Sequence, residues 1–193
     1  YTVNLGTGVT IFSFQTVRLP NTIDGGAIVF KDSDLYKKAL LTRDFGIRRD
    51  IFRDENNEIS AKCDISLLGY GATMSDMNSY IGCCQMDEIM MLLESQQRNA
   101  RRWDAIIEQT YPRFYRLNQR DEIQPNYWVY GFLCDRKIEV MLDFRKQGYY
   151  ASGVHLNNNC YSVFGNTEKL CGVNDFMKKF VAIPCGWWLN LNL

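Results

Sequence analysis

The side chains best suited to chemistry in this sequence are one histidine, scattered cysteines and a short segment of mixed polar groups. That segment is SFQTVR, residues 13–18, and its Arg18 suits a phosphate because the guanidinium donors can bind two oxygens. The single histidine, His155, is followed by Asn157 and two further asparagines, whose amides suit the hydroxyls of a sugar. A lone histidine is more often structural than catalytic, so both interpretations of His155 stay open.

The seven cysteines form no CxxC pair, and the chain has one histidine in all. A structural zinc site needs several such ligands at close spacing, so we expect no bound metal. The cysteine count is odd, and the surroundings of most cysteines are apolar. This pattern favours reduced, buried thiols in a cytoplasmic protein.

The composition narrows the class of protein. The 193 residues are 46% hydrophobic and 23% charged, which suffices for a sizeable core in one domain or two small ones. Lysines plus arginines and aspartates plus glutamates both number 22, so the net charge is zero and we expect no nucleic-acid partner. No run approaches the ~18 apolar residues of a membrane span, so we expect no membrane association. Residues 1–14 predict the approach to a buried strand and lack the pattern of a signal peptide.

Two strands and a helix must position the 13–18 segment. Residues 9–15 follow a glycine and are rich in β-branched and aromatic side chains, so they predict a strand. Residues 25–31 predict a second strand, which is entered through two glycines. Ser33 or Asp34 can cap the helix that follows, and Gly46 ends it.

A loop and two further helices come next. The charged stretch 48–62 predicts an exposed loop, and Ser75 caps a helix with apolar residues at helical spacing. A longer helix is expected over residues 87–111, with its stretch QQRNARR in solvent, and Pro112 stops it. The remainder predicts a compact α/β unit, which begins with a strand over 126–134 and a helix over 138–148. Residues 149–156 lead into another strand or an extended segment, and residues 173–184 predict a helix followed by a short strand.

Three segments stand in an order and at a spacing typical of one family. Residues 12–47 (FSFQTVRLPNTIDGGAIVFKDSDLYKKALLTRDFGI) resemble a Ser-Phe-His/Gln motif, a lysine and an acidic-Gly-Gly motif, followed by a strand and a helix. Residues 67–86 (LLGYGATMSDMNSYIGCCQM) resemble G-Y-N-x-R-M-S-D…A-x-I-G…Q-L, and residues 145–156 (RKQGYYASGVHL) resemble L-x-x-x-G-I…H. Together they resemble the C-terminal half of the DegT/DnrJ/EryC1/StrS sugar aminotransferases.

The resemblance implies a fold, a reaction and a cofactor. The fold is α/β, with residues 1–94 as the C-terminal portion of a three-layer large domain and residues 95–193 as a small α/β C-terminal domain. The family uses pyridoxal 5'-phosphate (PLP) to aminate nucleotide-linked keto sugars for polysaccharide synthesis. It implies a nucleotide-sugar substrate, a cytoplasmic location and a homodimer with active sites at the subunit interface.

Arg18 is the most informative departure from the family pattern. The family's catalytic lysine lies five residues after the motif serine, and counting from Ser13 gives Arg18. A guanidinium has a pKa above ~12, so it cannot supply the neutral amine that a Schiff base to PLP requires. Three interpretations stay open: a binding or inactive site, altered PLP chemistry as in a related dehydratase with histidine here, or transamination through another lysine.

The remaining site residues are also carried by the resemblance. Ser13 matches a serine that contacts the cofactor phosphate, and Gln15 matches the neighbouring His/Gln position. Gly71 and Thr73 stand where the family has an asparagine and an arginine, so both donors are absent, and a glycine-bearing turn that caps the next helix is the alternative. The family's sugar-binding cleft implies a substrate role for the 155–157 segment, in which His155 and Asn157 are the candidates.

Overall fold

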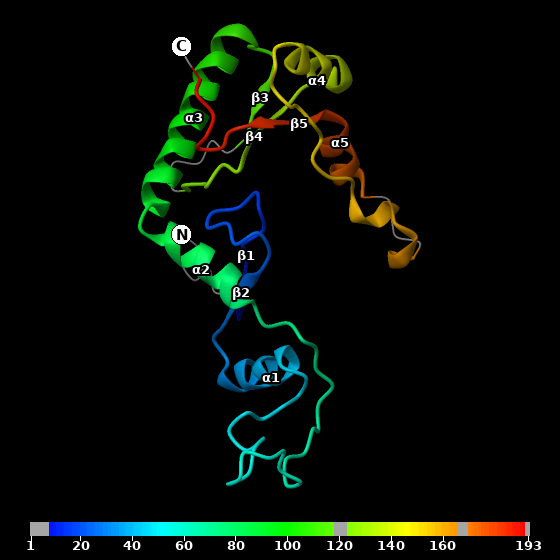
Figure 1. Cartoon of the computed structure of the whole chain (residues 1–193). Helices are drawn as coiled ribbons and strands as arrows, with labels where there is room; N and C mark the ends of the chain where they lie inside the picture. Colours follow the sequence, from blue (N-terminus) through cyan, green and yellow to red (C-terminus); the bar gives the residue numbers. More distant parts are fainter. Residues whose placement is uncertain (1–7, 118–122, 166–169, 192–193) are drawn as a thin grey trace. The chain divides into compact units, whose positions relative to one another are not determined.

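The computed structural model of the chain describes residues 8–117, 123–165 and 170–191. It divides into two compact units, Tyr1–Asp87 and Glu88–Leu193, called here the N-terminal and C-terminal units. Figure 1 shows the chain coloured along the sequence. The elements of the N-terminal unit are β1 (Val9–Ser13), β2 (Gly26–Phe30), α1 (Ser33–Arg43) and α2 (Asp76–Met86). Those of the C-terminal unit are α3 (Ile89–Thr110), β3 (Tyr115–Arg116), β4 (Val129–Leu133), α4 (Lys137–Lys146), the short 3-10 turns η1 (Asn158–Cys160) and η2 (Ser162–Phe164), α5 (Cys171–Lys179) and β5 (Phe180–Pro184).

The N-terminal unit is built on an antiparallel hairpin of β1 and β2. Its register pairs Val9 with Phe30 and Ser13 with Gly26. A Cβ on Gly26 would lie 2.5 Å from the carbonyl oxygen of Phe12, so the close approach of the two strands requires glycine there. Both predicted strands are therefore found, but β1 is not buried as expected, because Ile11 is 74% exposed. Residues 1–7 of the expected approach lie outside the described residues.

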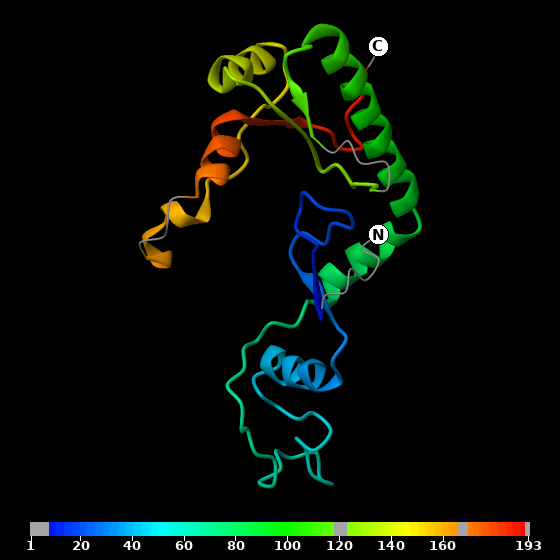
Figure 2. The same cartoon turned by 180° about the vertical axis from the view of Figure 1, so that it is seen from behind.

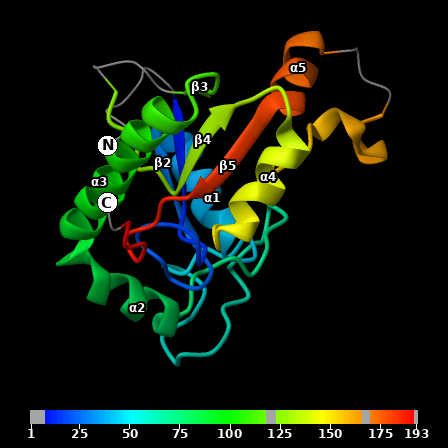
Figure 3. The ribbon, with the colours of Figure 1, turned by 90° about the horizontal axis from the view of Figure 1, so that it is seen from above.

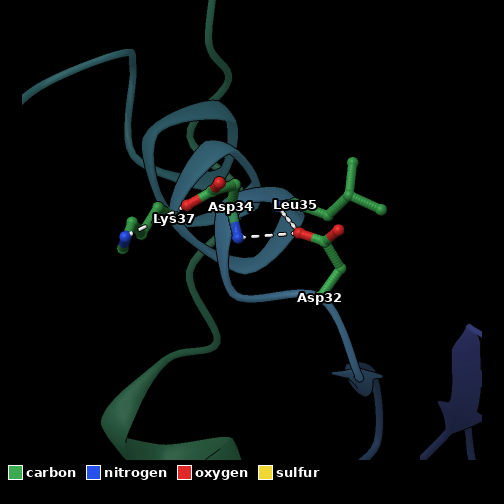
Figure 4. Close-up of polar contacts among 4 residues, drawn as sticks. All are labelled: Asp32, Asp34, Leu35 and Lys37. Carbon is green, nitrogen blue, oxygen red and sulfur yellow. Dashed lines mark hydrogen bonds and ion pairs between the residues drawn. The ribbon is translucent and has the colours of Figure 1, made fainter.

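Helix α1 begins one residue earlier than the sequence indicated. Asp32 has extended backbone geometry, and its Oδ1 accepts hydrogen bonds from the backbone N–H groups of Asp34 (2.8 Å) and Leu35 (2.9 Å). Figure 4 shows this cap beside the ion pair of Asp34 with Lys37. Asp32, and not Ser33 or Asp34, is thus the N-cap, because a carboxylate placed before the first turn reaches two free donors. These two hydrogen bonds lower the pKa of Asp32.

Helix α1 ends at Arg43, three residues before Gly46. A later segment of the chain, residues 70–72, returns to the C-terminal turn of this helix. Gly46 has a φ of +75°, which favours glycine. The backbone N–H of Tyr70 donates to the carbonyl of Thr42 (2.7 Å), and that of Ala72 donates to Arg43 (2.9 Å). The expected exposed loop over 48–62 is confirmed as turns with one short bridge, between Arg53 and Ile59.

In the C-terminal unit, three antiparallel strands in the order β3-β4-β5 pack against helices. Alternate residues of β4, Tyr130 and Phe132, are buried with Trp103 of α3 and Phe144 of α4 in one core. The Trp103 ring meets that of Phe144 edge-on at 6.1 Å, so α3 and α4 share this core. Figures 2 and 3 show α3 running beside the sheet and α5 leading directly into β5.

The stretch QQRNARR of α3 was expected in solvent, and this prediction is wrong for three of its residues. Gln96, Asn99 and Ala100 are buried. The amides avoid a desolvation cost because their Nδ2 and Nε2 atoms donate to backbone carbonyls. Gln96 donates to Asn126, and Asn99 donates to Gly186 and Leu189.

The other predicted elements of this unit are found with shifted bounds: β4 is shorter than the predicted strand, α4 begins and ends earlier than predicted, and α5 begins two residues earlier than predicted. The segment over 149–156 forms one bridge, from Ser152 to Ala182 of β5, and it is not extended throughout because Val154 has a φ of +61°. The expected domain boundary between residues 94 and 95 falls within α3, and the assignment of the two domains stays a prediction. The mixed α/β class is confirmed.

Candidate functional site

The candidate site is the loop that joins β1 to β2, residues 14–25, called here the Arg18 loop. The backbone N–H of Phe14 donates to Gly25 (3.0 Å), and that of Thr22 donates back to Phe14 (2.8 Å), which closes the loop at its base. Within it, the N–H of Arg18 donates to the carbonyl of Gln15 (2.8 Å), which forms a turn. The peptide bond between Leu19 and Pro20 is cis.

The side chain of Asn21 ties the two arms of the Arg18 loop together. Its Nδ2 donates to the carbonyl of Thr16 (3.0 Å), and its Oδ1 accepts from the backbone N–H of Ile23 (2.7 Å). Residues 16 and 23 flank Arg18 on either side in the sequence. This single amide therefore fixes the width of the loop around Arg18.

One face of helix α2 holds the Arg18 loop. Asn78, Gly82 and Gln85 are spaced by four and three residues, so they lie on the same side of the helix. Asn78 Nδ2 donates to the carbonyl of Asp24 (3.1 Å), and Gln85 hydrogen-bonds the backbone of Asn21. Gly82 is buried, and a Cβ there would lie 2.6 Å from Cγ2 of Thr22. The absence of a side chain at Gly82 lets α2 approach the loop.

The structure places Ser13, Gln15 and Arg18 in one continuous segment. Ser13 is the last residue of β1, Gln15 is exposed at the start of the turn, and Arg18 is half-buried. Ser13 also lines a groove of about 970 Å³ between the hairpin and α1, whose other polar groups include Lys38 and Arg43. The three residues are therefore neighbours along the chain, and their side chains carry donors that suit an anion.

These residues do not fit a PLP group held through a lysine at this loop. The Arg18 loop contains no lysine, and the guanidinium of Arg18 is not an amine that can bond an aldehyde carbon. Lys31 follows β2, and Lys37 on α1 forms an ion pair with Asp34 at 3.1 Å. The side chains of Ser13, Gln15 and Arg18 instead supply hydrogen-bond donors of the kind that suit an anion.

Gly71 and Thr73 precede α2, and the structure gives Gly71 a packing role. Gly71 forms a bridge with Asp44, and a Cβ at this position would collide with the ring of Phe45. The glycine serves the contact with the end of α1, while Ser75 caps the next helix by accepting from the N–H of Asn78 (3.2 Å). The Ser75 cap is thus confirmed, and the expected capping role for the turn at Gly71 is wrong.

His155 and Asn157 belong to the C-terminal unit. His155 is exposed, and its backbone N–H donates to the carbonyl of Gly153 (2.7 Å). Asn157 is half-buried, and its Nδ2 donates to the side-chain oxygens of Asn159 and Asn174, both at 3.0 Å. The three asparagines thus form an amide cluster. Its role toward a sugar stays a prediction.

The seven cysteines, all within the described residues, are free thiols. Cys134 and Cys185 are buried, and burial raises the pKa of both, that of Cys185 to about 12. The expectation of mostly buried thiols is otherwise wrong, because Cys83, Cys84, Cys160 and Cys171 are exposed. Cys83 and Cys84 lie on α2 beside the buried Gly82, where the helix turns them outward.

The described residues hold neither a cluster of metal ligands nor a helix that could span a membrane. Over 8–117, 123–165 and 170–191, no group of three or more histidines, cysteines, aspartates or glutamates is placed to hold a metal ion. No helix in the described part of the chain has the length and apolar character needed to cross a membrane.

Sequence reasoning missed the residues that hold the Arg18 loop, above all Gln85 and Asn21. Gln85 stood inside a recognised motif, but no role followed from the motif itself. The available signal was the spacing of Asn78, Gly82 and Gln85, which puts two amides and a glycine on one face of a helix. Such a face is suited to binding a backbone closely.

The sequence of this chain is similar to those of known aminotransferases. A model of the DegT/DnrJ/EryC1/StrS aminotransferase family matches residues 3–190. The chain is 25% identical over 192 residues to a UDP-4-amino-4,6-dideoxy-N-acetyl-beta-L-altrosamine transaminase of Helicobacter pylori, covering 94% of this chain and 48% of that protein. A protein of the same description from Campylobacter jejuni is 26% identical over 191 residues, with 95% and 48% covered.

Solved structures agree with the family match. The sugar aminotransferase CalS13 from Micromonospora echinospora has a TM-score of 0.85 at 26% identity, covering 96% of this chain and 50% of that one. Helicobacter pylori PseC, an aminotransferase involved in the biosynthesis of pseudoaminic acid, has a TM-score of 0.80 at 23% identity, with the same coverage, and shows the fold alone. The chain spans about half the length of the curated relatives it matches. The expected fold, the C-terminal portion of an aminotransferase of this kind, is confirmed.

Proposed function

Because this chain belongs to the DegT/DnrJ/EryC1/StrS aminotransferase family, we propose that it forms the C-terminal half of a protein that acts on a nucleotide-linked keto sugar. The family is PLP-dependent, and the proposed reaction class is amination of the sugar for synthesis of a surface polysaccharide or related glycan. In this proposal residues 1–94 belong to the cofactor-binding large domain and residues 95–193 form the small domain.

The observation that supports this proposal best is the extent of the likeness. The family model matches residues 3–190, and the fold of CalS13 covers 96% of the chain. Two relatives at 25% and 26% identity are named as transaminases of a UDP-linked amino sugar. We propose that Ser13 and Gln15 contact a phosphate, and that His155 and Asn157 contact the sugar.

Arg18 favours a second candidate, in which the protein binds a nucleotide sugar or a partner enzyme without transferring an amino group. The Arg18 loop supplies a guanidinium where the reaction needs an amine. Gly71 and Thr73 likewise lack the donors of the family pattern, so three positions tied to the cofactor differ together. This candidate keeps the fold and the anion-binding chemistry of the loop.

One experiment on the full-length protein separates the candidates. The protein is mixed with PLP, its absorption spectrum is recorded, and a lysine-linked cofactor is trapped with borohydride and located by mass spectrometry. Amino transfer to a keto sugar by the unmodified protein would rule out the second candidate. If no band and no adduct form, lysine-linked PLP catalysis is excluded. The second candidate also predicts that Arg18→Lys alone restores no turnover.

The proposal includes a homodimer and a cytoplasmic location, both carried by the family resemblance. A molar mass of twice the full-length chain, measured by light scattering, is the expected result for the dimer. Fractionation of the source cells tests the location.

A further inference from the structure

We propose that Gln85 is the positioning residue that presents Arg18 to a phosphate-bearing ligand. The ligand rests on the proposed function, in which PLP and a nucleotide sugar both carry phosphate. The positioning role rests on geometry within the N-terminal unit. Gln85 on α2 contacts Asn21 in the Arg18 loop, and these two residues lie 64 positions apart in the sequence.

Gln85 binds both polar groups of the Asn21 backbone. Its Oε1 accepts from the backbone N–H of Asn21 (2.9 Å), and its Nε2 donates to the carbonyl oxygen of the same residue. Nε2 also donates to the carbonyl of Ile81 (3.3 Å), one turn earlier in α2, which orients the amide. A carboxamide supplies one acceptor and two donors, and all three are used here. Methionine has a similar size and offers no N–H donor.

Asn21 in turn holds both arms of the Arg18 loop, because its side chain hydrogen-bonds the backbone of one residue on each side of Arg18. Its backbone is held by α2, while its side chain binds the carbonyl of Thr16 and the N–H of Ile23. Arg18 lies between these two anchors, and its own N–H is bonded to Gln15. Gln85 does not need to contact Arg18, because the loop backbone is held on both sides of it.

Ile23 gives independent support for a loop held in place from outside. Its φ is +67°, a left-handed conformation that β-branched residues rarely adopt. Such backbone strain persists where the surroundings over-determine it, and it gathers at ligand-binding segments. The hydrogen bond from the Ile23 N–H to Asn21 is one of the contacts that impose it.

A fixed loop matters for Arg18 because guanidinium recognition of phosphate depends on direction. Two parallel N–H groups must meet two oxygens, and a freely moving loop would lose that geometry. Arg18 is half-buried, so part of its stem is already confined in the loop. The ligand class is therefore a phosphate monoester or diphosphate. PLP and UDP are the probes that distinguish the two sources.

The test compares Gln85→Met with Met86→Ala, a matched control for the next residue of α2, which is exposed. Amide hydrogen exchange of peptides covering residues 14–25 is measured on the full-length protein. Loss of the hydrogen bonds to Asn21 is expected to speed exchange in the Arg18 loop about tenfold in Gln85→Met and to leave Met86→Ala unchanged. Unchanged exchange in Gln85→Met would overturn the positioning role.

The variant Gln85→Glu tests hydrogen bonding apart from packing. At neutral pH its carboxylate can accept from the Asn21 N–H but repels the Asn21 carbonyl, so exchange is expected to be as fast as in Gln85→Met. At a pH of about 3.5, below the ordinary glutamate pKa of about 4.3, most of these carboxyls are protonated and supply one donor and one acceptor, so protection relative to the intrinsic exchange rate should return. A role in packing alone predicts no such dependence on pH.

Calorimetric binding of PLP and of UDP completes the test. The probe that Arg18→Gln no longer binds should bind Gln85→Met about tenfold more weakly, and Gln85→Met should have no further effect in the Arg18→Gln background. Equal affinities of Gln85→Met and the unmodified protein would overturn the ligand-presenting role. If neither probe binds the unmodified protein, the proposed ligand is wrong, while the exchange experiment still decides the positioning role.

Discussion

The phenolic hydroxyl of Tyr130 on β4 donates a hydrogen bond to Oδ1 of Asp104 on α3, and the two oxygens are 2.6 Å apart. Tyr130 is 2% exposed, whereas Asp104 also lies 3.8 Å from Arg116 and reaches solvent. The bond therefore joins the long helix to the central strand at the edge of the aromatic core. Burial, followed by the bond to Asp104, raises the pKa of Tyr130 well above its usual range.

Tyr130→Phe should lower the free energy of unfolding by about 1–2 kcal/mol at pH 7, because a charge-assisted hydrogen bond is lost while the ring still fits. The native pKa is raised, so this contribution is present in full below the unfolded-state value of about 10 and is lost as the pH rises above it. Urea unfolding between pH 7 and 11 measures both effects. In Tyr130→Phe the decline above pH 10 should be shallower, and equal slopes would contradict the assignment.

Asp32→Ala should destabilise helix α1, because the N–H groups of Asp34 and Leu35 lose their acceptor. We expect a melting temperature lower by about 2–4 °C, and a smaller change for Asp32→Asn, which keeps an acceptor oxygen. The native pKa of Asp32 is lowered, so its contribution is present above the usual value near 3.8 and is lost as the pH falls through the native value. Thermal melts at pH 7 and pH 3 should differ less in Asp32→Asn.

Asn99→Ala should cost about 2–3 kcal/mol, because the carbonyls of Gly186 and Leu189 lose their shared donor inside the protein. Asn99 is 3% exposed, so water does not replace the amide readily. Arg98→Ala, one residue earlier and on the exposed side, is the matched control and should change stability little. Equal effects of the two substitutions in urea unfolding would count against a buried role for Asn99.

The same helix shows where sequence-based prediction ends. The helical period and Pro112 predicted α3 correctly, because both are local signals. Gln96 and Asn99 were assigned to solvent since amides are usually exposed, and their partners lie 30 to 90 residues away. Such burial depends on which backbone carbonyls the fold brings beside the helix. No local pattern carries that information.

In the candidate site, too, local features were predicted from the sequence and contacts between distant residues were not. The loop that carries Arg18 was predicted because two strand signals flank it, and the family resemblance supplied the meaning of residue 18. Gln85 was not predicted, because its contact with Asn21 spans 64 residues. The role of Gly71 was misjudged for a similar reason, since the Phe45 ring that excludes a side chain lies 26 residues earlier.

Thiol labelling should separate the cysteines by burial. Burial raises the pKa of Cys185 to about 12, so its thiolate population near pH 8 is very small. Cys83 and Cys84 are exposed on α2 and should react with iodoacetamide within minutes, whereas Cys185 should react only after unfolding. Mass spectrometry of peptides from native and urea-treated protein measures the order. Equal labelling of Cys185 in both samples would contradict its burial.

Gly71→Asn tests whether the family's donor can be restored at this position. A side chain at residue 71 collides with the Phe45 ring, so the substitution should cost about 1–3 kcal/mol and should not by itself add a phosphate contact. The double variant Gly71→Asn/Phe45→Ala removes the obstacle and should be less destabilised than the sum of the two single variants. Phe45 is itself half exposed, so its truncation alone should be mild. Urea unfolding of the four proteins gives the coupling directly, and strict additivity would show that the ring does not oppose a side chain at residue 71.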